Sequence, residues 1–124
     1  MSELKRVRSV LAVRDLRASV AFYRDTLGFT VETEYDGWCF LSRNNFRLMI
    51  GHCPDAVPAS RINDHSYFAY IEVDGIDALF AEFRSRGLKP LAPPESKPWG
   101  MREFMVATPD GHRMMFGEDL ERAQ

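Results

Sequence analysis

The sequence predicts an α+β fold of two tandem modules, each a strand, a helix and three further strands. Two observations carry this prediction. The segment FRLMIG at residues 46–51 returns as HRMMFG at residues 112–117, 66 positions later. A strand-and-helix pattern that ends at Gly28 also returns, shifted by about 60 positions, and ends at Gly87. Self-similarity of this kind indicates one supersecondary unit built twice.

In the first module, β-branched and apolar residues from Val7 to Val13 predict a strand of about seven residues. Asp15 is the predicted N-cap of a helix that stops at Gly28. Its apolar positions, at helical spacing, are Leu16, Val20, Tyr23 and Leu27. Three short strands, TVETEY, WCFLS and FRLMI, are predicted to follow, with a turn at RNN.

In the second module, YFAYIEV predicts the first strand, and Asp74 is the predicted cap of a helix that ends at Gly87. A strand around Lys89 to Leu91, REFMVA and HRMMFG are the three expected strands. The Pro-rich loop LAPPESKPWG and the turn TPDG separate them. We therefore expect a single domain over residues 1–124, with modules at about 4–52 and 65–118 and a linker at about 53–64.

Composition limits the function classes. A chain of 124 residues with 45% hydrophobic content can bury one real core. The net charge of −2 gives no global attraction to nucleic acid or an anionic membrane, so neither is an expected partner. No membrane span is visible and the opening MSELKRVRSV lacks an apolar signal core, so we expect a cytoplasmic protein. Cys39 and Cys53 are interpreted as buried or incidental thiols.

Two segments resemble a known family. The entry VLAVRDLRASVAFYRDTLGF and the ending PWGMREFMVATPDGHRMMFGE are similar to the vicinal oxygen chelate superfamily, which includes glyoxalase I, extradiol dioxygenases and bleomycin-resistance proteins. The PWG, REF and PDG elements resemble bleomycin-resistance proteins most closely. The resemblance implies that the sheets curl around a concave ligand cleft and that the protein forms a homodimer.

In enzymes of this superfamily, metal ligands come from the first and last strands of each module. Aligned onto this chain, those positions hold Arg8, Met49, Phe68 and Met115. None of these side chains is a hard ligand for zinc, iron, manganese, nickel or magnesium. The resemblance therefore implies no metal and no other cofactor here. Copper(I) bound by the two methionines would need further soft ligands, and core packing is the simpler interpretation.

Strand alternation predicts which side chains face the concavity. The predicted ligand-contacting set from the strands is Arg8, Arg47, Met49, Phe68, Tyr70, Glu72, Arg113 and Met115, beside Val10 and Ala12. Such an apolar and aromatic trough with several arginines suits a flat or partly aromatic ligand.

Two further residues join the predicted ligand-binding set. Trp99 lies in the loop KPWG and is expected to stack on the ligand at the rim. Glu103 lies beside Arg102, so the simplest interpretation is a structural ion pair or a solvent-facing strand residue. The alternative is a carboxylate that reaches into the site, together with Tyr70, as a ligand anchor or a general base. Trp38 covers another edge or packs in the core.

Two functions fit these residues. The first is a metal-free protein that sequesters a small molecule without catalysing a reaction. The alternative is a glyoxalase- or dioxygenase-like enzyme with an atypical or absent metal site. The missing ligands favour the binding protein. An arginine-rich trough would repel cationic bleomycin, so an anionic or neutral aromatic compound is expected to fit at least as well.

Overall fold

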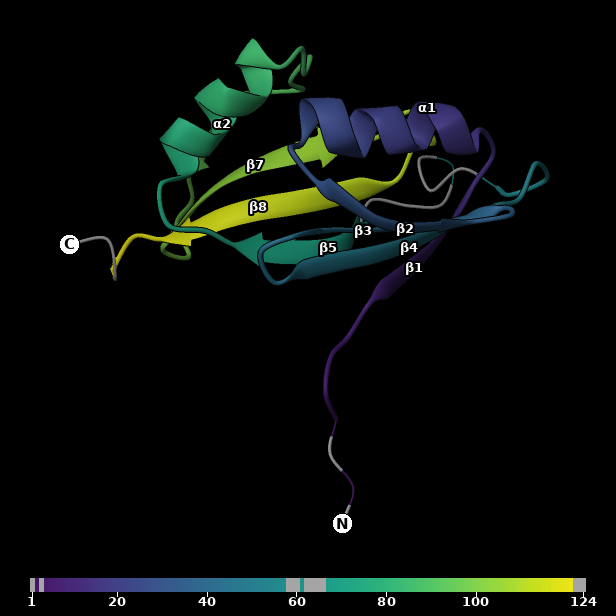
Figure 1. The fold of residues 1–124 in the computed structure, drawn as a ribbon. Helices are drawn as coiled ribbons and strands as arrows, with labels where there is room; N and C mark the ends of the chain where they lie inside the picture. Colours follow the sequence, from purple (N-terminus) through teal and green to yellow (C-terminus); the bar gives the residue numbers. More distant parts are fainter. Residues whose placement is uncertain (1, 3, 58–60, 62–66, 122–124) are drawn as a thin grey trace. The chain divides into compact units, whose positions relative to one another are not determined.

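The computed structural model describes residue 2 and residues 4–57, 61 and 67–121 (Figure 1). The chain divides into two compact units, residues 1–56 and residues 57–124. This division falls inside the predicted linker, of which residues 58–60 and 62–64 lie outside the described residues. No helix in the described ranges is long and apolar enough to cross a membrane.

The first unit holds a four-stranded sheet in the order β1-β4-β3-β2 (Figure 1). Its strands are β1 (Ser9–Val13), β2 (Thr30–Tyr35), β3 (Trp38–Arg43) and β4 (Phe46–His52). β1 and β4 are parallel, and the other pairs are antiparallel. Alternate residues point to opposite faces, so Leu48 and Ile50 of β4 are fully buried while Arg47 and Met49 lie on the other face.

Helix α1 (Leu16–Ala21) begins as predicted, because the Asp15 carboxylate accepts a hydrogen bond of 3.1 Å from the Ala18 N–H. The chain then continues as a π-helical segment, Phe22–Thr26, instead of a regular α-helix up to Leu27. Tyr23 and Leu27 are nevertheless both fully buried. The apolar spacing thus identified the buried positions correctly but not the helix type, since a π-helical turn changes the hydrogen bonding without changing the composition.

The second unit repeats this plan with the sheet order β5-β8-β7-β6. Its strands are β5 (Tyr67–Glu72), β6 (Glu95–Ser96), β7 (Met101–Ala107) and β8 (Arg113–Asp119), and its helix is α2 (Ile76–Ser85). Four aromatic rings, Phe80, Phe83, Phe104 and Phe116, pack edge to face or stacked between the helix and the sheet. The α+β class and the two repeated modules are confirmed.

Two predictions for this unit are wrong. The strand expected around Lys89 to Leu91 is absent from the described chain, and the short strand β6 lies at Glu95–Ser96 instead. Pro90, inside the expected strand, has no N–H to donate to a sheet. The expected cap Asp74 is also wrong, because the N-cap is Gly75 in the left-handed region with φ 88°.

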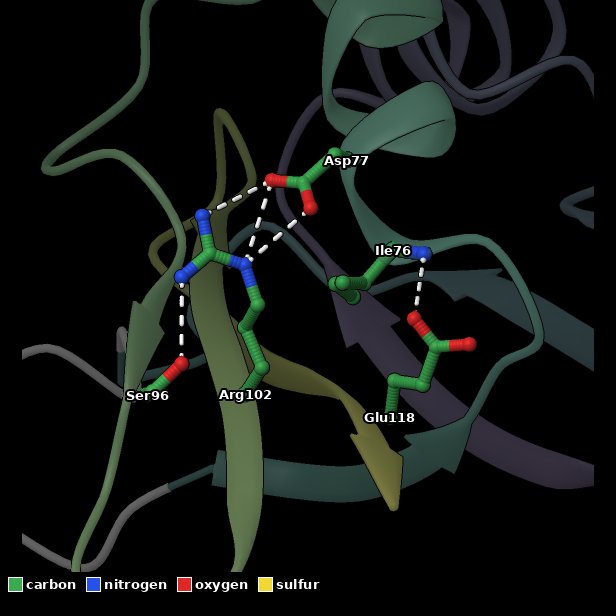
Figure 2. A network of polar contacts seen from close by, with 5 residues as sticks. All are labelled: Ile76, Asp77, Ser96, Arg102 and Glu118. Atoms are coloured by element: carbon green, nitrogen blue, oxygen red, sulfur yellow. Dashed lines mark hydrogen bonds and ion pairs between the residues drawn. The ribbon is translucent and has the colours of Figure 1, made fainter. Parts of the chain in front are cut away.

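The N-terminus of α2 is held by the sheet, as Figure 2 shows. Glu118 of β8 accepts hydrogen bonds from the N–H groups of Gly75 at 3.0 Å and Ile76 at 3.1 Å. Arg102 of β7 donates to Asp77 in the first helical turn at 2.9 Å, and to Ser96 of β6 at 3.2 Å. The Glu118 carboxylate, 43 residues from Gly75 in sequence, thus caps the helix in place of a local side chain.

Candidate functional site

A cleft of about 600 Å³ lies in the second unit, within the range of small-molecule sites. Strands β5, β7 and β8 and the turn before β7 supply its lining. The lining residues are Tyr67, Tyr70, Trp99, Met101, Glu103, Met105 and Met115. Among them are three aromatic rings, three methionines and one carboxylate.

Glu103 is the polar centre of the cleft. It alternates along β7 with Met101 and Met105, and its side chain is only 8% exposed. Its Oε2 accepts two hydrogen bonds, one from the Tyr70 hydroxyl at 2.7 Å and one from the Trp99 indole N–H at 3.2 Å. One carboxylate oxygen therefore fixes the polar ends of two aromatic side chains.

Tyr70 lies over a position where the sheet has no side chain. A Cβ on Gly117 of β8 would overlap the Tyr70 hydroxyl and would come within 2.7 Å of Cζ. Burial of the phenol raises the pKa of Tyr70, and the hydrogen bond to Glu103 raises it further. Tyr70 consequently stays a protonated donor, while the rest of its ring remains open, with 42% of the residue exposed.

Trp99 is positioned by a tight turn that leads into β7. The Gly100 N–H bonds to the Lys97 carbonyl at 3.0 Å, and the Lys97 N–H bonds to the Met101 carbonyl at 2.7 Å. Gly100 takes a φ of 86°, which glycine adopts without strain. The turn presents an indole that is 65% exposed but tied to Glu103. A ring that is both open and oriented is suited to stacking on a flat ligand.

The structure brings four of the predicted site residues together in this cleft: Tyr70, Trp99, Glu103 and Met115. Of the interpretations of Glu103, the ion pair with Arg102 is wrong, because Arg102 bonds to Asp77 and Ser96. The solvent-facing position is also wrong, because Glu103 is only 8% exposed. The carboxylate instead reaches Tyr70. Whether these residues bind a ligand stays a prediction.

Other predicted positions in the second unit lie elsewhere. A β-bulge between Tyr67 and Ala69 interrupts the alternation of β5, so Tyr67, not Phe68, lines the cleft. The Phe68 ring contacts His112. Glu72 lines a smaller pocket with Val73, Asp74 and Asp119, and Arg113 is not in the cleft lining.

Sequence reasoning missed Tyr67, Met101 and Met105. The alternation of β7 around Glu103 would have found the two methionines. The bulge leaves no sequence signal that we recognise, and it is what brings Tyr67 to the cleft.

In the first unit, Arg8, Arg47 and Met49 lie on or beside the sheet face turned away from the core. Arg8 forms a 2.7 Å ion pair with Glu32, and its guanidinium lies 5.0 Å from the Phe40 ring centroid. Met49 pairs with Phe40 across β3 and β4. Next along these strands, Trp38 pairs with Gly51, and its ring lies where a Cβ on Gly51 would fall. Trp38 therefore covers a glycine of the interior strand β4 and is not a core residue, because 39% of it is exposed.

The residues at the four positions that the resemblance assigns to metal ligands, Arg8, Met49, Phe68 and Met115, do not fit a metal. Guanidinium cannot coordinate at working pH and Phe68 has no donor atom, which leaves two thioethers. Within the described ranges, no group of three or more His, Cys, Asp or Glu side chains is arranged to hold a metal ion. We therefore derive no chemistry through a metal at these positions.

The two βαβββ units, one of which carries an open cleft on its sheet, define an α+β fold built from a duplicated module. Residues 5–116 match the family model of the Glyoxalase/Bleomycin resistance protein/Dioxygenase superfamily, and the chain belongs to this family. It is 32% identical to a bleomycin resistance protein of Geobacillus stearothermophilus, over 90% of this chain and 94% of the relative.

Solved structures agree with this assignment. The bleomycin-binding protein of Streptomyces verticillus, complexed with copper(II)-bleomycin, superposes with a TM-score of 0.72 at 29% identity, covering 94% of this chain and 97% of the other. A second bleomycin-binding protein, complexed with bleomycin, gives a TM-score of 0.77 at 22% identity over 93% of this chain and 98% of the other. The second comparison supports the fold alone.

Proposed function

We propose that this protein is a metal-free binding protein that sequesters a small, flat, partly apolar molecule in the cleft of its second unit. The observation that carries this proposal is the single Glu103 carboxylate oxygen that holds both Tyr70 and Trp99. The polar tips of the two side chains are fixed while the rings stay open. A preorganised aromatic pair loses little conformational entropy when it binds a ligand.

The methionines favour binding over catalysis. Met101, Met105 and Met115 give the cleft a soft, adaptable wall that fills the gaps around an irregular ligand. Glu103 as a general base would face a developing negative charge with no metal to stabilise it, because the four corresponding positions lack suitable donors. The enzymatic alternative therefore has no observation in its favour.

Bleomycin is the first ligand to test, because relatives and fold neighbours carry its name. The expected repulsion of cationic bleomycin by arginines does not apply to this cleft. Among the described residues that line the cleft there is one carboxylate, Glu103, and no arginine. Arg8, which the sequence placed in the trough, belongs to the first unit and is paired with Glu32. A cationic drug would therefore meet a negative charge here.

Isothermal calorimetry of the protein with metal-free bleomycin tests the proposal. We expect saturable binding near one ligand per chain. Glu103→Ala removes a residue that lines the cleft and should weaken binding. The control is Leu91→Ala, at an exposed position outside the lining, which should leave binding unchanged. Binding that is unaffected by Glu103→Ala in a folded variant would move the site elsewhere.

We further propose a homodimer. Val10 and Trp38 are large apolar residues exposed on the sheet face of the first unit that is turned away from the core, and such surface is commonly covered by a partner. Light scattering after gel filtration should give twice the mass of 14.3 kDa. A concentration-independent monomer would contradict this. A cytoplasmic location stays a prediction, which cell fractionation would test.

A further inference from the structure

We propose that the ligand of this cleft carries a cationic nitrogen with an N–H donor, and that Oε1 of Glu103 is its anchor. An amine, amidine or guanidine on a flat aromatic body has the required chemistry. This inference rests on the proposed binding function and specifies the charge and the donor group of the ligand.

The hydrogen-bonding pattern of the Glu103 carboxylate leaves one oxygen available to a ligand. Both protein donors, the Tyr70 hydroxyl and the Trp99 indole, bond to Oε2. The other oxygen, Oε1, makes no hydrogen bond or ion pair with any residue that the structure describes. A carboxylate oxygen has two acceptor sites, so Oε1 has its full capacity left for a ligand.

The charge of Glu103 favours a cationic ligand. Glu103 is 8% exposed, yet both of its partners are neutral donors. The adjacent cation, Arg102, points to the other side of the strand and bonds to Asp77 in α2 (Figure 2). A carboxylate at low exposure without a cation pays a desolvation cost that a bound cation would offset. A charge-assisted bond is also about twice as strong as a neutral one.

The side chains around the Glu103 carboxylate favour an aromatic cation. Tyr67, Tyr70 and Trp99 line the same cleft and have open ring surfaces. Aromatic faces attract cations as well as flat apolar groups. The cleft thus combines one anionic acceptor with rings that favour a delocalised, aromatic cation over an aliphatic ammonium. An anionic aromatic ligand would gain the stacking but would be repelled by Glu103.

Three tricyclic probes of matched size test this inference: 9-aminoacridine, which is cationic; acridine at a pH where it is neutral; and anthracene-9-carboxylate, which is anionic. Calorimetry should give the tightest binding for 9-aminoacridine, by about tenfold or more over acridine, as expected for a hydrogen bond to a charged group. The anionic probe should bind most weakly.

Glu103→Gln removes the charge and keeps the shape. It should abolish the preference for 9-aminoacridine and leave the affinity for acridine within about twofold, since the stacking surfaces remain. Glu95→Gln is the matched control, because it removes a carboxylate from the adjacent strand β6 at the position paired with Glu103 but outside the cleft lining. It should preserve the preference. Thermal melting checks that both variants fold.

The outcomes separate the two proposals. If the wild type binds acridine and 9-aminoacridine equally, or if Glu103→Gln keeps the cation preference, the anchor is overturned while aromatic binding stands. If none of the three probes binds, the proposed binding function fails as well.

Discussion

The ring of Tyr70 occupies the space over Gly117 in the adjacent strand. A side chain on Gly117 would overlap the Tyr70 hydroxyl. The contact places that hydroxyl 2.7 Å from Glu103 Oε2. The absence of a side chain at Gly117 therefore allows Tyr70 to take this position, and Gly117 can be tested as a positioning residue.

We expect Gly117→Ala to displace Tyr70 and to lower the free energy of unfolding by about 1–3 kcal/mol, as overpacking typically does. Urea denaturation measures this loss. In a Tyr70→Ala background the same substitution should cost much less, because the clashing ring is gone, so the double-mutant cycle isolates the contact. Equal costs in both backgrounds would show that the clash is not the cause.

The tie between Trp99 and Glu103 predicts a difference between two substitutions. Trp99→Ala removes the ring and should weaken ligand binding about two- to tenfold, the value of an aromatic contact of about 0.5–1.5 kcal/mol. Trp99→Phe keeps a stacking surface but loses the indole donor, so its loss should be smaller.

The free energy of unfolding of both Trp99 variants should lie within about 0.5 kcal/mol of the wild-type value, because this exposed side chain contributes little to the core. Calorimetry and urea denaturation together check the pair. Unchanged affinity in Trp99→Ala would remove this residue from the site.

The Tyr70 phenol should titrate late. Burial first, and the hydrogen bond to Glu103 second, raise its pKa above the ordinary 10.0. An ultraviolet absorbance titration should therefore show one tyrosine that keeps its proton above pH 10.0, and this late transition should be absent in Tyr70→Phe. In Glu103→Gln its pKa should fall part of the way, since burial remains. The raised pKa favours the folded state below about pH 10, and this contribution is lost as the pH rises through the folded-state pKa.

The capping of α2 by Glu118 predicts an acid-sensitive helix. The N–H groups of Gly75 and Ile76 lower the pKa of this carboxyl below its ordinary 4.5. Its contribution to stability is therefore present above that pH and is lost as the pH falls through the folded-state pKa. Glu118→Gln should be less stable than the wild type at neutral pH, and the difference should shrink in acid.

The control for Glu118→Gln is Glu121→Gln, which removes the same charge three positions further along the chain. Urea midpoints across a pH series measure both. A constant gap between Glu118→Gln and the wild type at every pH would argue that the charge of the cap is irrelevant.

Much of the fold could be predicted from local pattern. The repeated FRLMIG and HRMMFG hexapeptides became β4 and β8, which lie beside the first strand of their units in both cases. The Asp15 cap was also correct, because its hydrogen bond reaches only three residues along the chain. Interactions of this kind are encoded over short distances and leave a readable signal.

The errors came from interactions over longer distances or from irregular backbone. The cap supplied by Glu118 comes from another strand, so no pattern around Asp74 reveals it. The bulge in β5 shifts the alternation by one residue, which moves Tyr67 to the cleft in place of Phe68. The alternatives for Glu103 stayed open because the sequence shows its neighbour Arg102 but not the contact of Arg102 with Asp77 in helix α2.

The duplicated glycines, Gly51 and Gly117, have different partners on the neighbouring antiparallel strand. Trp38 pairs with Gly51, whereas Glu103 stands at the equivalent place beside Gly117. In the first copy the tryptophan fills the space over the glycine with its own ring. In the second copy a carboxylate stands there, and Tyr70 covers the glycine from the strand on the other side. One exchange at a duplicated position thus gives the two copies different surfaces: the first covers its glycine with a tryptophan ring, while the second has a carboxylate oxygen, Glu103 Oε1, to which no described residue donates a hydrogen bond. The two halves of the chain share a fold but differ in the chemistry of this position.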